Sequence, residues 1–351
     1  MPYTQLNNLD FADIKLALKQ YMREQTDFTD YDFEGSAISQ ILDVLAYNTY
    51  YTAFNTNMVV NELFLDSATL RDNVVSLAKQ LGYTPKSITS PKAVVDMQLI
   101  LTGVAPSTVV LKKGTGFITN YDNALYEFVL KDDYRKEVVN DTVTFTDLPI
   151  YEGSIVVTQT TVDTSLKNQR FIISNSGADT STLSVKVFES SNSTVSTTYE
   201  RAENILEVGS TDKVYFLSEV EDEQYEVFFG DGVLGEKLSN QNVVEISYVV
   251  TSGVITNGAK TFTFNGTLVD ASDVTITSPF SVSNLSTTSA ASGGAEIESV
   301  AKIKFNAPKF FGSQNRAVTS NDYSAIVRKI YPSISDIIVF GGEEQEPPAY
   351  G

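Results

Sequence analysis

The most regular pattern of apolar positions lies between Asp30 and Pro85. Apolar residues recur there close to the i, i+3, i+4, i+7 spacing of one helix face. The residues in this pattern are Ile38, Ile41, Leu42, Leu45, Ala46, Ala53 and Phe54. Ser36, just before this pattern, is placed to cap the N-terminus of a helix. The pattern predicts one long helix, with a second, shorter helix after a break.

The shorter helix carries signals at both ends. Its start is expected near residues 66–69, where Asp72 follows Thr69 in a capping-box arrangement. Its end is expected at Gly82, with Pro85 just beyond. An earlier amphipathic helix is predicted from about Asp10. Asp10 and Asp13 would lie in its first turn, where the helix dipole stabilises acidic side chains. The region before about residue 85 is therefore predicted to be helical.

From Ala93 to about Ser289 the pattern changes to short β-branched runs separated by Gly, Asn, Asp, Ser and Pro. Such runs predict an antiparallel, sandwich- or barrel-like region. The segments 190–198 and 281–294 contain few bulky residues, and we interpret the second as an exposed interdomain linker. The predicted fold class is thus α+β.

A third region begins with a helical pattern near Ala295. Thr319 and Asp322 form a capping-box pattern that opens a helix through Ile330. The run Asp336–Phe340 then has the composition of a strand. We expect domains at 1–85 (helical), 86–290 (β-rich) and 291–351 (the beginning of an α/β domain).

Several short motifs carry a family resemblance. DYDFEGS, LAYNT, TLR and LGYTP occur in this order in the helical region, and RAVT-x-x-DY occurs near residue 319. Together they resemble the baseplate wedge proteins of T-even-type contractile-tailed phages, which belong with the J-like baseplate proteins. Family members continue well past Gly351, so a partial chain is expected.

The resemblance implies a structural role in the virion, in the tail baseplate, after assembly in the host bacterial cytoplasm. It implies that the helical region pairs two copies as a homodimer and grips other baseplate wedge proteins. A C-terminal domain would join adjacent wedges in a ring around the tail tube, and the ring would relay the change that triggers sheath contraction. Deleting everything after Ser299 is then expected to spare partner binding and abolish ring formation.

Aromatic residues crowd the long helix on more than one face, and each such face must be buried. The general alternative is a core within one chain, but the resemblance favours a helix bundle shared between chains. The predicted interface residues are Leu42, Leu45, Tyr47, Tyr50, Phe54 and Phe64. All of them except Tyr50 are also expected to be mostly buried, some against another chain.

Composition narrows the chemistry. The formal net charge is −19, from 44 acidic and 25 basic residues, and a charge of this sign repels the phosphates of nucleic acid, so no nucleic-acid partner is expected. No apolar run reaches the roughly 20 residues of a membrane span. Cysteine and histidine are absent, so disulfides, cysteine-bound zinc and the usual catalytic triad are excluded. We expect no catalytic residue, no cofactor and no metal.

Three motifs have ordinary structural interpretations. Gly230, Gly232 and Gly235 match G-x-G-x-x-G, but a strand pattern follows, so a tight hairpin at Asp231-Gly232 is predicted. The acidic run 219–223 is expected to be a solvated loop, and Lys-Lys-Gly-Thr-Gly at 112–116 a turn. Two rival functions stay open, a tail-associated hydrolase of glycans that uses two carboxylates and a receptor-binding β protein.

Overall fold

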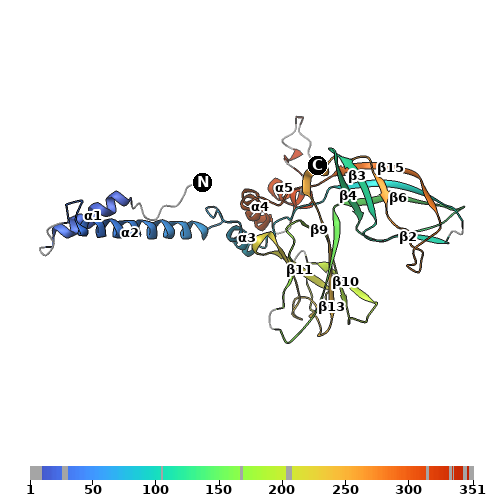
Figure 1. Cartoon of the computed structure of the whole chain (residues 1–351), viewed down its shortest axis with the longest axis horizontal. Coiled ribbons are helices and arrows are strands. Elements are labelled where there is room, and N and C mark those ends of the chain that lie inside the picture. Colours follow the sequence, from blue (N-terminus) through green and yellow to red (C-terminus); the bar gives the residue numbers. More distant parts are fainter. Residues whose placement is uncertain are drawn as a thin grey trace. The chain divides into compact units, whose positions relative to one another are not determined.

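The computed structural model describes residues 10–25, 31–103, 106–166, 169–202, 208–313, 316–331, 334, 336–342 and 346–347. The chain divides into two compact units. One is built from residues 1–82 and 300–307, the other from residues 83–299 and 308–351. Helices, a β-rich middle and two further helices follow one another in sequence, which confirms the predicted α+β class (Figure 1).

Three helices open the chain: α1 (Phe11–Arg23), α2 (Ala37–Glu62) and α3 (Arg71–Gln80). The predicted start of α2 is confirmed, because the Ser36 hydroxyl accepts a hydrogen bond from the Ser39 amide at 3.0 Å. Asp10 caps α1 as expected. The predicted end of α3 is also confirmed, since Gly82 has a φ of +73°, the left-handed conformation that glycine adopts most easily.

The capping box predicted for α3 is wrong. The N-cap residue is Leu70, which has no side-chain capping bond. The carboxylate of Glu62, at the end of α2, instead accepts hydrogen bonds from the Thr69 amide at 2.8 Å and from the Thr69 hydroxyl at 2.5 Å. Because Thr69 is held by Glu62, the start of α3 is fixed by the preceding helix and not by its own first turn.

The first β sheet has the strand order β14-β3-β4-β6-β1-β15. Its strands are β1 (Lys92–Leu101), β3 (Gly116–Tyr121), β4 (Ala124–Leu130), β6 (Thr142–Glu152), β14 (Thr263–Asn265) and β15 (Phe280–Ser292). The two edge strands approach each other, because the rings of Phe264 and Phe280 lie 6.1 Å apart. Near the other end of β15, Gly258 and Ala259 bond to the main chain of Ala291. The sheet therefore curls towards a barrel, one of the two architectures that the pattern left open.

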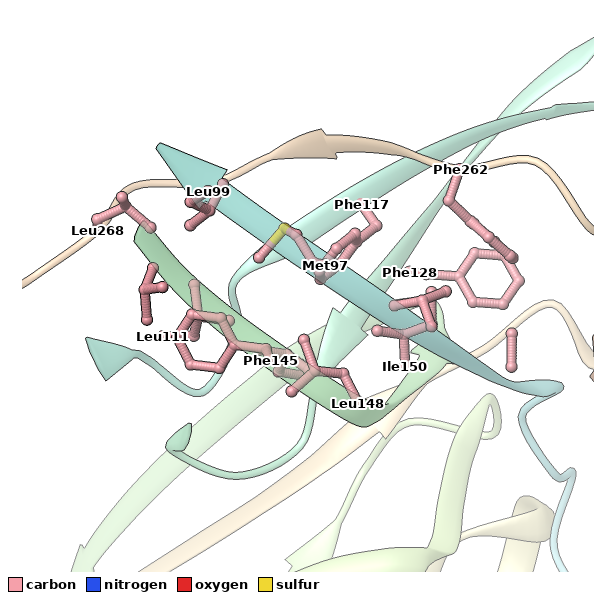
Figure 2. Packing of buried hydrophobic residues seen from close by; sticks show 14 of the residues in the cluster. Met97, Leu99, Leu111, Phe117, Phe128, Phe145, Leu148, Ile150, Phe262 and Leu268 are labelled. Atoms are coloured by element: carbon pink, nitrogen blue, oxygen red, sulfur yellow. The ribbon is translucent and has the colours of Figure 1, made fainter. Parts of the chain in front are cut away.

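Fully buried side chains fill this curled sheet, among them Met97, Phe117, Phe128 and Phe145 (Figure 2). They come from β1, β3, β4 and β6, and Phe262 packs edge-on against Phe128 at 4.9 Å between ring centroids. Strands β2 (Thr108–Leu111) and β5 (Tyr134–Glu137) form a separate two-stranded ladder. Alternation of buried and exposed positions along β1 follows from the two faces of a strand.

The second sheet has the order β7-β13-β9-β10-β11-β12-β8. Its strands are β7 (Ser154–Thr161), β8 (Phe171–Ile173), β9 (Ala178–Phe188), β10 (Ser196–Arg201), β11 (Val214–Glu219), β12 (Tyr225–Phe229) and β13 (Val243–Val250). All its neighbours pair antiparallel except β10 and β11, which are parallel. Its own core includes Val185, Tyr225, Val227 and Val244.

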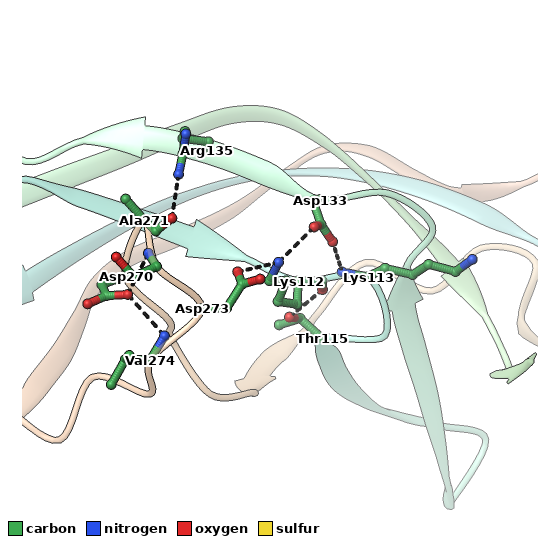
Figure 3. A network of polar contacts seen from close by, with 10 residues as sticks. Lys112, Lys113, Thr115, Asp133, Arg135, Asp270, Ala271, Asp273 and Val274 are labelled. Atoms are coloured by element: carbon green, nitrogen blue, oxygen red, sulfur yellow. Dashed lines mark hydrogen bonds and ion pairs between the residues drawn. The ribbon is translucent and has the colours of Figure 1, made fainter. Parts of the chain in front are cut away.

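Figure 3 shows the ion pairs and hydrogen bonds around the turn at residues 112–115. The Lys112 ammonium pairs with Asp133 at 3.1 Å and with Asp273 at 2.5 Å, and the Lys113 amide donates to Asp133 at 2.7 Å. The Lys113 ammonium donates to the hydroxyl of Ser247 in β13. Burial lowers the pKa of Lys113, with help from nearby Lys186. The predicted turn is confirmed, and it has a structural role.

The linker predicted at residues 281–294 is wrong. This segment contains most of β15, which pairs with β1 from Leu101 to Lys92. Its small polar side chains are mostly exposed because β15 lies at a sheet edge. Main-chain hydrogen bonds, which do not depend on side-chain type, hold it in place.

The predicted strand Asp336–Phe340 is also wrong, because these residues have no regular secondary structure. A strand must pair its main-chain groups with a neighbour, and no β partner for this segment lies among the residues that the structure describes. The helix before it is confirmed. In α5 (Ser320–Ile330), Thr319 and Asp322 form the expected capping box.

Two smaller predictions need correction. The turn after Phe229 exists, with Asp231 accepting from the amides of Val233 and Leu234, but it does not close a hairpin. Strand β12 pairs with β11 and β8, whereas β13 pairs with β7 and β9. Within the acidic run, residues 221–223 form a short 3-10 helix (η2, Glu221–Glu223), but Glu219 is buried in β11 and is not solvated.

Candidate interaction surface

One face of α2 is covered within the chain. Helix α1 packs along it, and Lys15 of α1 pairs with Asp43 of α2 at 2.6 Å, which raises the pKa of Lys15. Ile14 is buried in α1. The buried residues of α2 are Ser39, Leu42, Ala46, Ala53, Asn57 and Asn61. Their spacing places them on one side of the helix, so the remaining sides face outwards in the isolated chain.

The predicted interface residues divide between these sides. Leu42 is buried, with 4% of its surface exposed, but Leu45 is 47% exposed and Tyr47 is 61% exposed. Tyr50, Phe54 and Phe64 are exposed as well. Only Leu42 is therefore buried by the chain itself, and burial of the other five stays a prediction about a partner.

An uncovered aromatic stripe runs along α2. Its members recur at intervals of three and four residues, the spacing of a seam between packed helices. They are Val44, Tyr47, Tyr51, Phe54 and Met58, and all are exposed. The rings of Tyr47 and Tyr51 stack with their centroids 6.3 Å apart. Val44 and Met58 were missed in the sequence, although the three-four spacing identifies them.

A second exposed stripe consists of Ile41, Leu45, Val59 and Leu63. Threonines lie between these apolar positions, and their hydroxyls bond within the helix. Thr49 donates to the carbonyl of Leu45 at 2.9 Å, and Thr56 donates to the carbonyl of Thr52 at 2.8 Å. These hydroxyls need no further partner, so burying this side leaves them satisfied.

The exposed part of α2 carries no charge from Val44 to Asn61. That is unusual in a chain with a net charge of −19, because solvent-facing helix sides are normally lined with charged residues. Two apolar stripes without a charge between Asp43 and Glu62 are typical of a helix that is enclosed by further helices. No described helix has the length and apolarity required to cross a membrane.

Other candidate chemistry is sparse in the described residues. They contain no group of three or more Asp or Glu side chains arranged to hold a metal ion. A cavity of about 530 Å³ lies beside the turn 112–116 and is lined by one carboxylate, that of Glu127. The hydrolase mechanism considered above needs two facing carboxylates, so this cavity does not provide its site.

Comparison with known proteins bears on both ends of the chain. Residues 10–83 match the family described as "Baseplate wedge protein gp6-like, helical domain". Residues 319–351 match "Baseplate structural protein gp6, C-terminal domain I". The resemblance to baseplate wedge proteins is confirmed. The first match contains α1, α2 and α3, so both exposed stripes lie within the segment that matches this helical domain.

A relative that matches most of the chain is also found. Baseplate wedge protein gp6 of Enterobacteria phage T4 is 28% identical over 345 residues, which cover 92% of this chain and 50% of the relative. The chain thus spans about half the length of that relative. A chain of the anti-feeding prophage (AFP) baseplate, solved by cryo-EM, has 13% identity and a TM-score of 0.29, covering 95% of this chain and 66% of that one. A TM-score this low supports no conclusion about the fold.

Proposed function

We propose that this chain is a structural subunit of a phage tail baseplate wedge. Its helical unit joins a second copy and other wedge proteins through the exposed stripes of α2. Its C-terminal segment belongs to a domain that links adjacent wedges into a ring around the tail tube. Rearrangement of that ring relays the signal that triggers sheath contraction, so the protein acts in the virion after assembly in the host cytoplasm.

The observation that carries the proposal is the uncharged, exposed surface of α2 inside a segment that matches a baseplate wedge helical domain. Large aromatic side chains such as Tyr47 and Phe54 are the residue types that anchor protein interfaces most often. Each exposed ring that becomes buried contributes roughly 1.5–3 kcal/mol of hydrophobic free energy. An assembly partner is the simplest source of that burial.

A non-catalytic role agrees with the chemistry of the chain. Histidine and cysteine are absent, and the relative from phage T4 is a baseplate wedge protein. The described acidic side chains do not gather into a metal-binding group. We therefore propose binding surfaces, and no active site, as the working parts of the molecule.

The proposal is tested by changing Leu45 to Asp and coexpressing the full chain with the other wedge proteins of its phage. A charge placed in a desolvated helix interface is strongly unfavourable. We expect the variant to remain folded, because Leu45 is exposed in the isolated chain, and to lose at least ten-fold in partner recovery by affinity purification.

Leu125→Asp is the matched control. Leu125 is 73% exposed and lies in the β-rich unit, so the same substitution there should leave partner recovery unchanged. Equal recovery of wild type and Leu45→Asp would contradict the assignment of α2 as the wedge interface. Circular dichroism at 222 nm checks that both variants keep their helices.

A further inference from the structure

Strand β7 forms one edge of the second sheet, and its outer side is open in the middle. Its inner side pairs with β13 along its whole length, from Ser154 to Thr161. Main-chain groups of a strand alternate between the two sides. At the end of this ladder the Val162 amide donates to the Asn242 carbonyl. The main-chain N–H and C=O groups of even-numbered residues in β7 therefore point towards β13, and those of odd-numbered residues point outwards.

The chain itself closes both ends of this outer side. The Gly153 amide donates to the carbonyl of Glu127 in β4 at 2.9 Å. The Thr161 carbonyl accepts a hydrogen bond from the Gln169 side chain at 2.7 Å. Between them, the outward main-chain groups of Ile155, Val157 and Gln159 have no hydrogen-bond partner within the described part of the chain.

This edge also lacks the usual protection against strand pairing. Proteins commonly blunt an open edge with charge, proline or a very short strand. No residue from Gly153 to Val162 is charged, and none is proline. At the opposite edge of the same sheet, β8 has only three residues and is flanked by the ion pair of Arg170 with Glu226 at 2.8 Å.

The open section is symmetric about Val157. The two closed positions, Gly153 and Thr161, lie four residues before and after it. A second β7, placed antiparallel about a two-fold axis at Val157, would set Ile155 opposite Gln159 of the other copy. Pairing would stop where both strands are already occupied, since Gly153 would face Thr161. Each contact in a two-fold interface occurs twice, so self-complementarity of this kind is what a homodimer edge requires.

We propose that β7 is a strand-pairing site for a second copy of this chain, with Val157 at the two-fold axis. Charge supports this occupant. Two molecules that each carry −19 repel each other over most of their surfaces, whereas two β7 edges meet without a like-charged pair. The site is separate from the α2 stripes and does not depend on the function proposed for them.

Disulfide trapping tests the pairing, and the chain offers a clean background because it has no cysteine. Val157→Cys in the full chain should cross-link to itself under mild oxidation. Paired residues in such a ladder have Cα atoms about 5.5 Å apart, within the range that a disulfide spans. Val195→Cys is the control for random collision, because Val195 is also exposed but lies outside β7, in the loop before β10.

A second experiment tests the register in which the two β7 strands pair. Ile155→Cys chains mixed with Gln159→Cys chains should form mixed dimers, whereas Ile155→Cys alone should not, because its two copies would lie about 13 Å apart along the strands. We expect Val157→Cys to cross-link at least ten times faster than Val195→Cys. Equal rates for these two, or self-linking of Ile155→Cys as fast as that of Val157→Cys, would overturn the pairing.

The experiment is repeated with Leu45→Asp in each chain. If Val157→Cys still cross-links faster than Val195→Cys in that background, the result supports β7 pairing even without the α2 interface. Failure of the β7 site with normal recovery of wedge partners would leave the proposed function standing. The two ideas can therefore fail separately.

Discussion

Glu62 is the residue at which local sequence rules and the folded chain differ most clearly. Capping rules compare positions about three residues apart, and they selected Thr69 and Asp72. The carboxylate that holds Thr69 comes from seven residues earlier, and it also accepts from the Asn73 amide group at 2.9 Å. Only the turn between α2 and α3 brings these groups together, so no helix-end pattern could have identified Glu62.

The environment of Glu62 also predicts a dependence on pH. Partial burial raises its pKa, but hydrogen bonds from Thr69, Asn73 and Leu70 outweigh this effect and bring the pKa from 4.5 to about 2. A lowered pKa in the folded state means that ionised Glu62 stabilises the fold above the unfolded-state pKa of 4.5. This contribution is lost as the pH falls from there towards 2.

Glu62→Gln should therefore lower the melting temperature of the helical unit at pH 7 by a few degrees. The gap between variant and wild type should narrow steadily below about pH 4.5. Thermal unfolding followed by circular dichroism across pH 3–7 measures it. Glu34→Gln removes the same charge from an exposed position without a hydrogen bond in the described residues, and it should show no comparable gap. A gap for Glu62→Gln that is independent of pH would contradict the role of its charge.

At the scale of elements, helices were predictable and strand pairing was not. Helix ends depend on residues close in sequence, so Ser36, Gly82 and the Thr319–Asp322 box could be recognised directly. Strand β15 depends on β1, almost 200 residues away, and its serine-rich sequence resembles a linker. The interface residues show the same limit. Leu42 and Leu45 look alike in sequence, but Leu42 lies on the buried side of α2 and Leu45 on an exposed side.

Two distant segments, 86–89 and 295–298, illustrate such pairing. Thr89 and Ala295 exchange main-chain hydrogen bonds at 2.8 and 3.1 Å. The buried Glu298 carboxylate accepts from the Tyr83 hydroxyl at 2.8 Å and from the Lys86 amide at 3.0 Å. These segments lie next to residues 82 and 300, where the chain passes between the two units. Main-chain and side-chain hydrogen bonds therefore hold these two segments together.

Tyr83→Phe should weaken the hydrogen bonding between segments 86–89 and 295–298, because it removes one donor to Glu298. Loss of a hydroxyl that donates to a buried carboxylate destabilises by about 1–3 kcal/mol. We expect faster hydrogen exchange at the amides of residues 86, 89, 295 and 298, with little change in the barrel core. Tyr126→Phe is the control, because the Tyr126 hydroxyl makes no hydrogen bond within the described residues. Unchanged exchange in Tyr83→Phe would show that Glu298 is held by other contacts.

For the whole molecule, the sequence predicted three consecutive regions, but the compact units are not consecutive. Helix α4 (Val300–Ser313) begins within the helical unit, which includes residues 300–307. Ile303 and Ala307 are fully buried, and the Lys304 ammonium donates to the carbonyl of Asp66 at 3.2 Å. Tertiary packing alone reveals this return of the chain, because nothing in the local pattern of α4 refers to residues before Gly82.

This return changes where the chain can be cut. Ending the chain after Ser299 removes Ile303 and Ala307 from the helical unit and uncovers the apolar surface they bury. Loss of a buried isoleucine side chain alone costs roughly 2–5 kcal/mol. Ending it after Ser313 keeps α4 and removes α5. We therefore expect the shorter fragment to melt at a lower temperature in its helical unit and to lose wedge-partner binding, contrary to the expectation from the sequence.

The fragment ending at Ser313 should bind wedge partners as the full chain does but fail to join wedges into rings, because it lacks the segment that matches the C-terminal domain. Affinity recovery measures partner binding, and electron microscopy of assembled particles measures ring closure. Ile303→Ala in the full chain separates packing from length, since it should reproduce part of the lost thermal stability while leaving rings intact. If the fragments ending at Ser299 and Ser313 are equally stable, α4 is dispensable to the helical unit. If either fragment still closes rings, the ring contact lies elsewhere in the chain.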